Sequence, residues 1–198
     1  MNFLKAVGKF FGGFFVLFGI TIFIMSYFGI YAVNNFNVLE NDVKNLGVDL
    51  NQLEEYCSQN LNDANCQNSM LKGIKKEIDD FRYYGSLMRV IGFIIFILGF
   101  LLFVWCSGWM NGLRQTSLIS LIGIIFSYIY YKYAIINAIN SFLSEEIIEI
   151  INNWATITIN KTLNLILILG VIFLILTISL YILKYKKMKL LEKAPTKK

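Results

Sequence analysis

The sequence contains no histidine, only one proline and few charged residues. Without histidine, the chain lacks the usual general base, the side chain that titrates near neutral pH and the commonest metal ligand. Charged residues make up 16% of the chain and hydrophobic residues 57%, whereas about a quarter of an ordinary soluble domain is charged. This composition argues against a soluble enzyme and favours a membrane protein.

The remaining residues form no recognisable catalytic or metal-binding motif. The chain has no Gly-x-Ser-x-Gly, no His-Glu-x-x-His and no P-loop sequence. Its cysteines, Cys57, Cys66 and Cys106, are too few and too scattered for a structural zinc site. We therefore predict a non-enzymatic protein without a cofactor, a metal site or a nucleic-acid partner, and we identify no small-molecule substrate.

Four apolar runs cover residues 10–33, 88–109, 117–136 and 163–183. A helix needs roughly 20 apolar residues to cross the hydrocarbon core of a bilayer, and each run reaches or approaches that length. Membrane β-strands need only about 10 residues and alternate apolar with polar ones, which these runs do not do. The sequence predicts an all-α integral membrane protein, a bundle of four transmembrane helices.

The distribution of charge predicts the orientation of these helices. Residues 1–9, 110–116 and 184–198 are rich in lysine and arginine, and Glu192 is their only acidic residue. Residues 34–87 and 137–162 carry the other acidic residues. Because cytoplasmic loops are enriched in basic residues, we expect a multi-pass protein of the cell membrane with both termini in the cytoplasm.

The basic C-terminal segment has two interpretations. Basic residues near a membrane surface attract anionic lipids by about 1 kcal/mol each, so the segment is a candidate site for lipid headgroups. It can equally act as a determinant of topology alone. The candidate headgroup ligands are Lys184, Lys186, Lys187 and Lys189.

Two heptad patterns lie between the first two apolar runs. Apolar residues spaced alternately three and four apart are typical of a coiled-coil seam. We predict that residues 34–87 form an extracytoplasmic, antiparallel coiled-coil hairpin. The first seam is Phe36, Leu39, Val43, Leu46, Leu50 and Leu53; the second is Leu71, Ile74, Ile78 and Phe81, continuing through Gly85 and Met88.

Cys57 and Cys66 flank a segment rich in turn-forming residues between the two seams. The predicted topology exposes both thiols to an oxidising compartment, so we expect a disulfide at the tip of the hairpin. The other interpretation is a pair of free thiols.

The second extracytoplasmic segment, residues 137–162, contains a shorter amphipathic pattern. Ser144 is a candidate N-cap, followed by acidic residues in the first turn and by four isoleucines on one face. We expect a short amphipathic helix here. Glycines within the apolar runs, such as Gly92 and Gly99, are predicted points of close helix approach.

Three functions fit this architecture. The preferred one is assembly or protein–protein interaction through the hairpin, with membrane lipids and a homo-oligomer or a second membrane protein as partners. The alternative is a channel or transporter formed by oligomerised bundles, and the third is a sensor or accessory subunit. The candidate pore-lining residues for the alternative are Thr116, Ser120, Ser127, Asn137 and Asn140.

Overall fold

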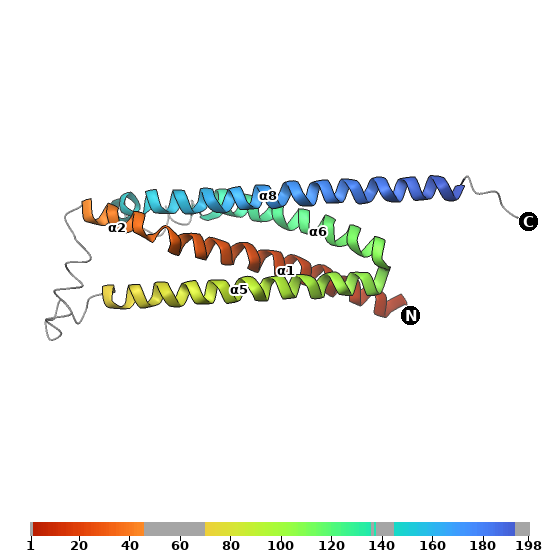
Figure 1. The fold of residues 1–198 in the computed structure, drawn as a ribbon, viewed down its shortest axis with the longest axis horizontal. Helices are drawn as coiled ribbons and strands as arrows, with labels where there is room; N and C mark the ends of the chain where they lie inside the picture. Colours follow the sequence, from red (N-terminus) through yellow and green to blue (C-terminus); the bar gives the residue numbers. More distant parts are fainter. Residues whose placement is uncertain (1, 46–69, 136, 138–144, 193–198) are drawn as a thin grey trace, which may run out of the picture. The chain divides into compact units, whose positions relative to one another are not determined.

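The computed structural model describes residues 2–45, 70–135, 137 and 145–192. Every regular element in these ranges is helical (Figure 1). The elements are α1 (Asn2–Asn34), α2 (Phe36–Asn45), α5 (Met70–Ser107), α6 (Trp109–Ile129), the π-helix η1 (Tyr130–Ala134) and α8 (Glu145–Glu192).

Four of the helical stretches are long and apolar enough to cross a membrane: Phe3–Asn34, Asp80–Ser107, Trp109–Ala134 and Ile151–Lys187. The predicted all-α class and the four apolar helices are therefore confirmed. The chain has the fold of a helical membrane protein.

The helices extend beyond the predicted boundaries. Residues 110–116, expected to form a loop, are helical because α6 begins at Trp109. The amphipathic segment after Ser144 is not a separate short helix, since α8 runs without interruption from Glu145 to Glu192. No proline lies between those residues, so nothing in the covalent chain forces that helix to end.

The outgoing helix of the predicted hairpin is not a simple extension of α1, because the chain turns at Asn35. Both the backbone N–H and the side-chain Nδ2 of Asn35 donate to the carbonyl oxygen of Tyr31, at 3.0 and 2.6 Å. Asparagine side chains that bond nearby backbone groups compete with the helical ladder. Helix α2 then begins anew at Phe36.

The chain divides into two compact units. Unit 1 comprises Met1–Phe23, Val90–Ile129 and Leu165–Lys198, and unit 2 comprises Ile24–Arg89 and Tyr130–Asn164. Segments of α1, α5 and α8 occur in both units.

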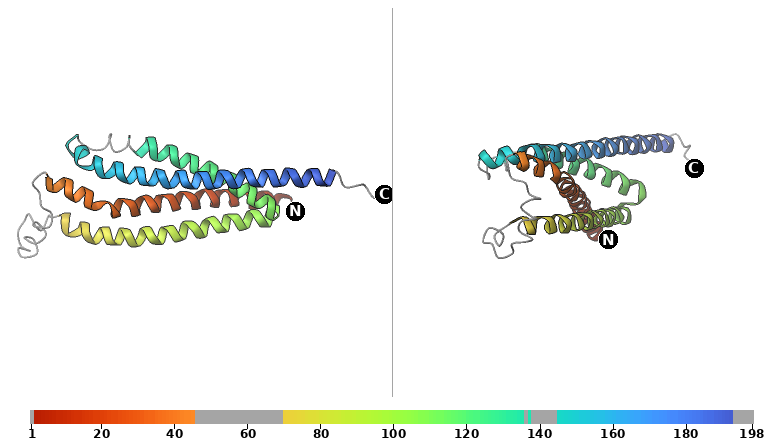
Figure 2. Two further views of the ribbon diagram at one scale, coloured as in Figure 1. Left: turned by 45° about the horizontal axis from the view of Figure 1, so that its top comes forward. Right: turned by 60° about the vertical axis from the view of Figure 1, so that its left-hand side comes forward.

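In unit 1, α1 and α5 run antiparallel and touch through glycines (Figures 1 and 2). A Cβ atom on Gly99 would lie 2.8 Å from the carbonyl oxygen of Gly12, and one on Gly92 would lie 2.9 Å from that of Gly19. Neither position has room for a side chain, because the obstacle is backbone. Small residues of this kind let membrane helices approach closely.

A single residue, Gly108, connects α5 to α6 in unit 1. Its φ of 79° lies in the left-handed region that favours glycine, so the chain reverses within one residue. Four residues later, a Cβ atom on Gly112 would lie 2.8 Å from the backbone of Val104. Gly108 therefore makes the turn, and Gly112 lets the backbones of α5 and α6 come into contact next to it.

In unit 1, hydroxyl side chains are buried beside apolar core residues such as Val16 and Ile124, and many large apolar side chains face outward. Buried hydroxyl residues include Thr116, Ser117, Ser120, Ser127 and Thr177, whereas Phe14, Leu98, Ile125, Ile168 and Ile175 are each about half exposed or more. A soluble domain rarely exposes so many large apolar side chains together. This distribution suits a helical bundle surrounded by lipid.

In unit 2, α1 and α5 stay antiparallel, but side chains separate them. Gly85 faces the side chain of Ile30, with a Cβ–Cγ1 separation of 3.2 Å, and Gly29 faces the ring of Phe81 at 3.4 Å. The backbone oxygen of Ser26 lies 3.7 Å from the Gly85 Cβ position. The contacting positions of α1 and α5 are therefore 12 with 99, 19 with 92, and 26 with 85. From each pair to the next, the position on each helix changes by seven residues.

Candidate functional site

The largest cavity with a described lining lies in unit 2 and has a volume of about 600 Å³. It is bordered by segments of α1, α2, α5, η1 and α8. Its lining is almost entirely apolar or aromatic. The lining residues are Met25, Phe28, Gly29, Ala32, Val33, Phe36, Phe81, Tyr130, Tyr131, Ile135 and Trp154.

Two of these residues, Tyr130 and Tyr131, belong to the π-helix η1. Tyr131 is only 3% exposed, and its ring centroid lies 5.3 Å from that of Phe28. Tyr130 is 51% exposed and stands edge-on to Tyr131. A π-helical turn inside a longer helix is rare and is frequent at functional sites. Here it supplies two neighbouring aromatic rings to one cavity.

Trp154 connects the cavity wall to the end of α1. Its indole Nε1–H donates to the carbonyl oxygen of Ala32 at 2.8 Å. Ala32 belongs to the last turn of α1, where carbonyl groups have no partner within the helix. The indole therefore satisfies a helix terminus and holds α8 against α1 within unit 2.

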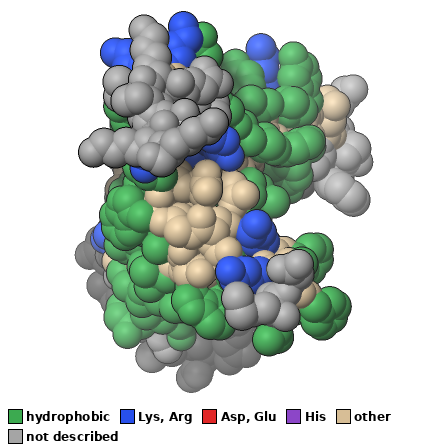
Figure 3. All heavy atoms as spheres, turned by 90° about the vertical axis from the view of Figure 1, so that its right-hand side faces the viewer, with side chains coloured by type: hydrophobic (Ala, Val, Ile, Leu, Met, Phe, Trp, Pro, Cys, Tyr) green, Lys and Arg blue, Asp and Glu red, His purple; other side chains and the backbone are tan. Residues whose placement is uncertain are grey.

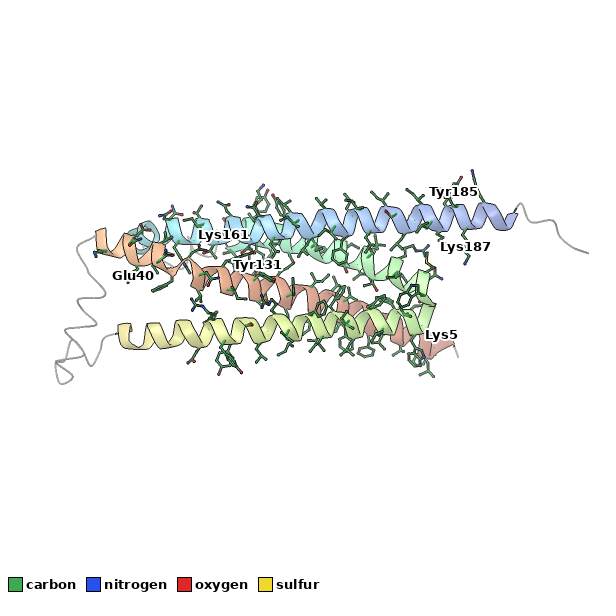
Figure 4. The ribbon with its side chains drawn as sticks, viewed as in Figure 1. Lys5, Glu40, Tyr131, Lys161, Tyr185 and Lys187 are labelled. Atoms are coloured by element: carbon green, nitrogen blue, oxygen red, sulfur yellow. The ribbon has the colours of Figure 1, made fainter. Side chains whose placement is uncertain are left out.

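Lys161 also contacts the C-terminal end of α1, at Asn35. Its ammonium group donates to Oδ1 of Asn35, which directly precedes the cavity residue Phe36. A cation at a helix C-terminus is favoured by the helix dipole. Figure 4 labels Lys161 on α8 and the buried Tyr131, both in unit 2.

Unit 1 holds a second polar feature, a contact between α6 and α8. The hydroxyl groups of Ser117 and Thr177 lie 2.6 Å apart and are buried. Thr177 also donates to the carbonyl oxygen of Phe173 at 2.7 Å, which uses its only proton. The Ser117 hydroxyl also lies 3.3 Å from this carbonyl oxygen, so the two hydroxyls and the oxygen form one hydrogen-bonded cluster that fastens α6 to α8.

Three of the five candidate pore-lining residues do not lie on an outward surface. Thr116, Ser120 and Ser127 are all buried on the inner face of α6, and Ser120 donates to the carbonyl oxygen of Thr116 at 2.7 Å. Asn137 is exposed, and Asn140 lies outside the described residues. Hydroxyls buried within one chain are not available to line a pore between chains.

The described members of the predicted seams fall on the expected helices. Phe36 and Phe81, one from each seam, line the same cavity, and Leu39 is half-buried. Val43 belongs to α2, and Leu71, Ile74 and Ile78 belong to α5. Leu46, Leu50, Leu53, Cys57 and Cys66 lie outside the described residues.

The four candidate headgroup lysines lie in the last turns of α8. Lys186 and Lys187 are exposed, and the Lys189 ammonium lies 4.9 Å from the ring centroid of Tyr185. Among the residues that Figure 3 colours, lysine and arginine side chains are visible on the face that it presents, and no aspartate or glutamate is.

The sequence patterns did not single out Asn35, Trp154 or Lys161. One signal was available for Lys161, which is the only charged residue between Glu149 and Lys184. An isolated charge in an apolar segment is a candidate functional residue by default. No comparable signal marks Asn35 or Trp154, because their partners are distant in the chain.

The fold defines the class of this protein: an all-helical membrane protein with four helices able to span the bilayer. Comparison with known proteins finds no family model, no characterised relative and no solved structure that matches the chain.

Proposed function

We propose that the protein is a non-enzymatic, multi-pass protein of the cell membrane that acts in assembly or protein–protein interaction. The acting element is a coiled-coil hairpin formed by residues 34–87 on the extracytoplasmic side. Exposed coiled-coil seams commonly serve pairing between helices. The partner is a second copy of this chain or another membrane protein.

One observation carries this proposal: α1 and α5 are paired antiparallel at positions 12/99 and 19/92 in unit 1 and at 26/85 in unit 2, each pair seven residues from the next. Gly85 and Phe81 both belong to the second predicted seam, and both contact α1. These two heptad positions of α5 therefore face α1. A hairpin over residues 34–87 would extend this pairing away from the membrane, with a Cys57–Cys66 disulfide at its tip.

The charges of the two units support the orientation of the hairpin. Unit 1 contains ten basic residues and one acidic residue, a net charge of +9. Unit 2 contains eight basic and twelve acidic residues, a net charge of −4. By the positive-inside rule, the ends of the chain belong in the cytoplasm and the hairpin outside. Lys184, Lys186, Lys187 and Lys189 would then meet anionic headgroups of the inner leaflet.

The test is a charge placed in the seam. In Leu50→Asp, a carboxylate replaces a side chain whose burial is worth about 1.5–3 kcal/mol, so the hairpin should open. We expect a fall in oligomer mass of the full-length protein in detergent, measured by light scattering after size exclusion. Limited proteolysis should also become faster within residues 34–87.

The matched control is Asn51→Asp, which adds the same charge one residue away, outside the seam. It should leave both oligomer mass and proteolysis unchanged. If Leu50→Asp also retained both properties, the coiled-coil proposal would be wrong, and the membrane-spanning segments would become the acting element.

A further inference from the structure

We propose that the aromatic cavity of unit 2 binds an acyl chain of an anionic membrane phospholipid, whose phosphate is held by Lys161. The cavity shares Phe36 and Phe81 with the predicted seams, but the proposal does not depend on how the protein assembles. It combines three features of unit 2: the cavity, the ammonium group beside it, and the π-helix in its wall.

The cavity has the size and lining of a site for an apolar ligand. Ligand sites typically measure about 300–1,000 Å³ and are mainly hydrophobic and aromatic, and this cavity measures about 600 Å³. The polar side chains of its lining are Tyr130, Tyr131 and Trp154, and Trp154 has already given its N–H to Ala32. A polar ligand would lose its hydration and gain few hydrogen bonds. In a bilayer, lipid chains are the apolar molecules present at high concentration.

Lys161 determines which lipid is favoured. Its ammonium group has three donors, and its contact is with the neutral amide of Asn35. Among the described residues, no carboxylate is paired with it. A cation within an apolar segment needs a counter-charge or water. Lys161 does not line the cavity, but its partner Asn35 directly precedes the cavity residue Phe36, and the ammonium would hold the phosphate at this end of α1.

The π-helix gives the cavity a shaped wall. Tyr130 and Tyr131 are consecutive residues, yet both border the cavity, one half-exposed and the other buried. Phe28 packs on Tyr131 from α1. An unusual helical turn lined by aromatic rings is a costly feature for mere packing, and such turns are frequent at functional sites. Together these rings form the surface on which the chain would lie.

Photolabelling of the full-length protein tests this site. The protein is reconstituted in phosphatidylcholine vesicles with a trace of phosphatidylglycerol or phosphatidylcholine that carries a photoreactive group in its acyl chain. We expect cross-links on peptides containing Phe28, Tyr131 or Trp154. Labelling by phosphatidylglycerol should exceed labelling by phosphatidylcholine about tenfold, the ratio that corresponds to 1.4 kcal/mol.

Two variants with matched controls test the acyl-chain cavity and the phosphate-binding lysine separately. Ala32→Phe fills the cavity and should abolish labelling, whereas Ala134→Phe, at an exposed position outside the lining, should not. Lys161→Gln should remove the preference for phosphatidylglycerol, whereas Lys5→Gln, at an exposed position of unit 1, should keep it. Thermal unfolding in detergent checks that each variant folds, and Ala32→Leu replaces Ala32→Phe if the larger side chain is not tolerated.

Cross-links at these peptides that Ala32→Phe does not reduce would overturn the cavity as the site. Equal labelling by the two lipids in the unaltered protein would overturn the role of Lys161. Since Leu50→Asp should leave labelling unchanged, failure of this proposal is distinguishable from failure of the hairpin proposal.

Discussion

Units 1 and 2 use parts of the same helices but pack them in different ways. In unit 1, Gly12 and Gly19 meet Gly99 and Gly92 backbone to backbone, and a cavity beside this contact measures only about 140 Å³. In unit 2, Ile30 and Phe81 stand between the same two helices, and the cavity measures about 600 Å³. The same seven-residue register between α1 and α5 therefore has two outcomes. With glycine at the contact the two backbones touch, and with larger side chains a lined cavity remains.

The polar contacts differ between the units as well. Unit 1 joins α6 to α8 through two neutral hydroxyls, Ser117 and Thr177. Unit 2 joins α8 to the end of α1 through an indole and an ammonium group, from Trp154 and Lys161. Hydroxyl pairs are inexpensive to bury, whereas an ammonium group in an apolar segment is costly and therefore suggests a function.

The largest expected effect comes from adding a methyl group to the glycine seam. Gly92→Ala places a Cβ atom 2.9 Å from both the Gly19 oxygen and the Phe23 nitrogen, so the backbones must separate. We expect a loss of about 3 kcal/mol, the upper end of typical overpacking costs. Unfolding of the purified protein in detergent, followed by circular dichroism, measures this loss.

Gly85→Ala in unit 2 is the matched comparison. Its Cβ atom would be crowded only by the movable side chain of Ile30 at 3.2 Å, because the Ser26 oxygen at 3.7 Å is an ordinary contact, and alanine favours helix by about 1 kcal/mol over glycine. This variant should be close to neutral. Equal destabilisation by the two substitutions would contradict the difference between the backbone contact of α1 and α5 in unit 1 and their side-chain contact in unit 2.

The next effect concerns charge. Lys186→Gln combined with Lys187→Gln removes two exposed cations from the end of α8. At about 1 kcal/mol for each basic residue near an anionic surface, the selectivity for anionic lipid should weaken by about 2 kcal/mol. Spin-labelled phosphatidylglycerol, compared with spin-labelled phosphatidylcholine, measures this selectivity in vesicles. Unchanged selectivity would leave these lysines as determinants of topology alone.

The smallest effects concern the hydrogen bonds between helices. Ser117→Ala removes the hydroxyl that is hydrogen-bonded to Thr177, and Trp154→Phe removes the donor to the Ala32 oxygen. Hydrogen bonds between membrane helices average about 0.6 kcal/mol, so each loss should be near that size in the same unfolding assay. Trp154→Phe should cost slightly more, because the phenyl ring is also smaller.

Thr116→Val is the control for these substitutions. The Thr116 hydroxyl is buried and makes no hydrogen bond, so valine of similar shape should be neutral or stabilising. A clear loss of stability in this variant would mean that the hydroxyl has a role in the folded protein beyond this packing.

The features that the sequence predicted well are those that depend on neighbouring residues. Apolar runs of about 20 residues are sufficient for membrane helices, whatever they pack against. Phe81 and Gly85, two positions of the predicted second seam, lie against α1 at Gly29 and Ile30, whereas the coiled coil between the two seams stays a prediction. The boundaries were predicted less well, because Gly108 reverses the chain in one residue and α8 continues where a loop was expected.

The candidate site could be predicted only in part. Phe36 and Phe81 came from the seams, but nothing in their spacing indicates a cavity between them. The hydroxyls of Thr116, Ser120 and Ser127 suggested a pore, because sequence shows that they share a face but not which partner covers it. In the structure that face is buried within the chain.

The sequence alone thus determined the membrane class, the four apolar helices and the contrast in charge between the two units, since hydropathy and charge are properties of the residues themselves. Tertiary structure decided the turn at Asn35, the glycine contacts between α1 and α5, and the meeting of Trp154 and Lys161 with the end of α1. These features join residues up to 126 positions apart. Such pairs form only when the packing of whole helices brings them together, and no local pattern encodes that choice.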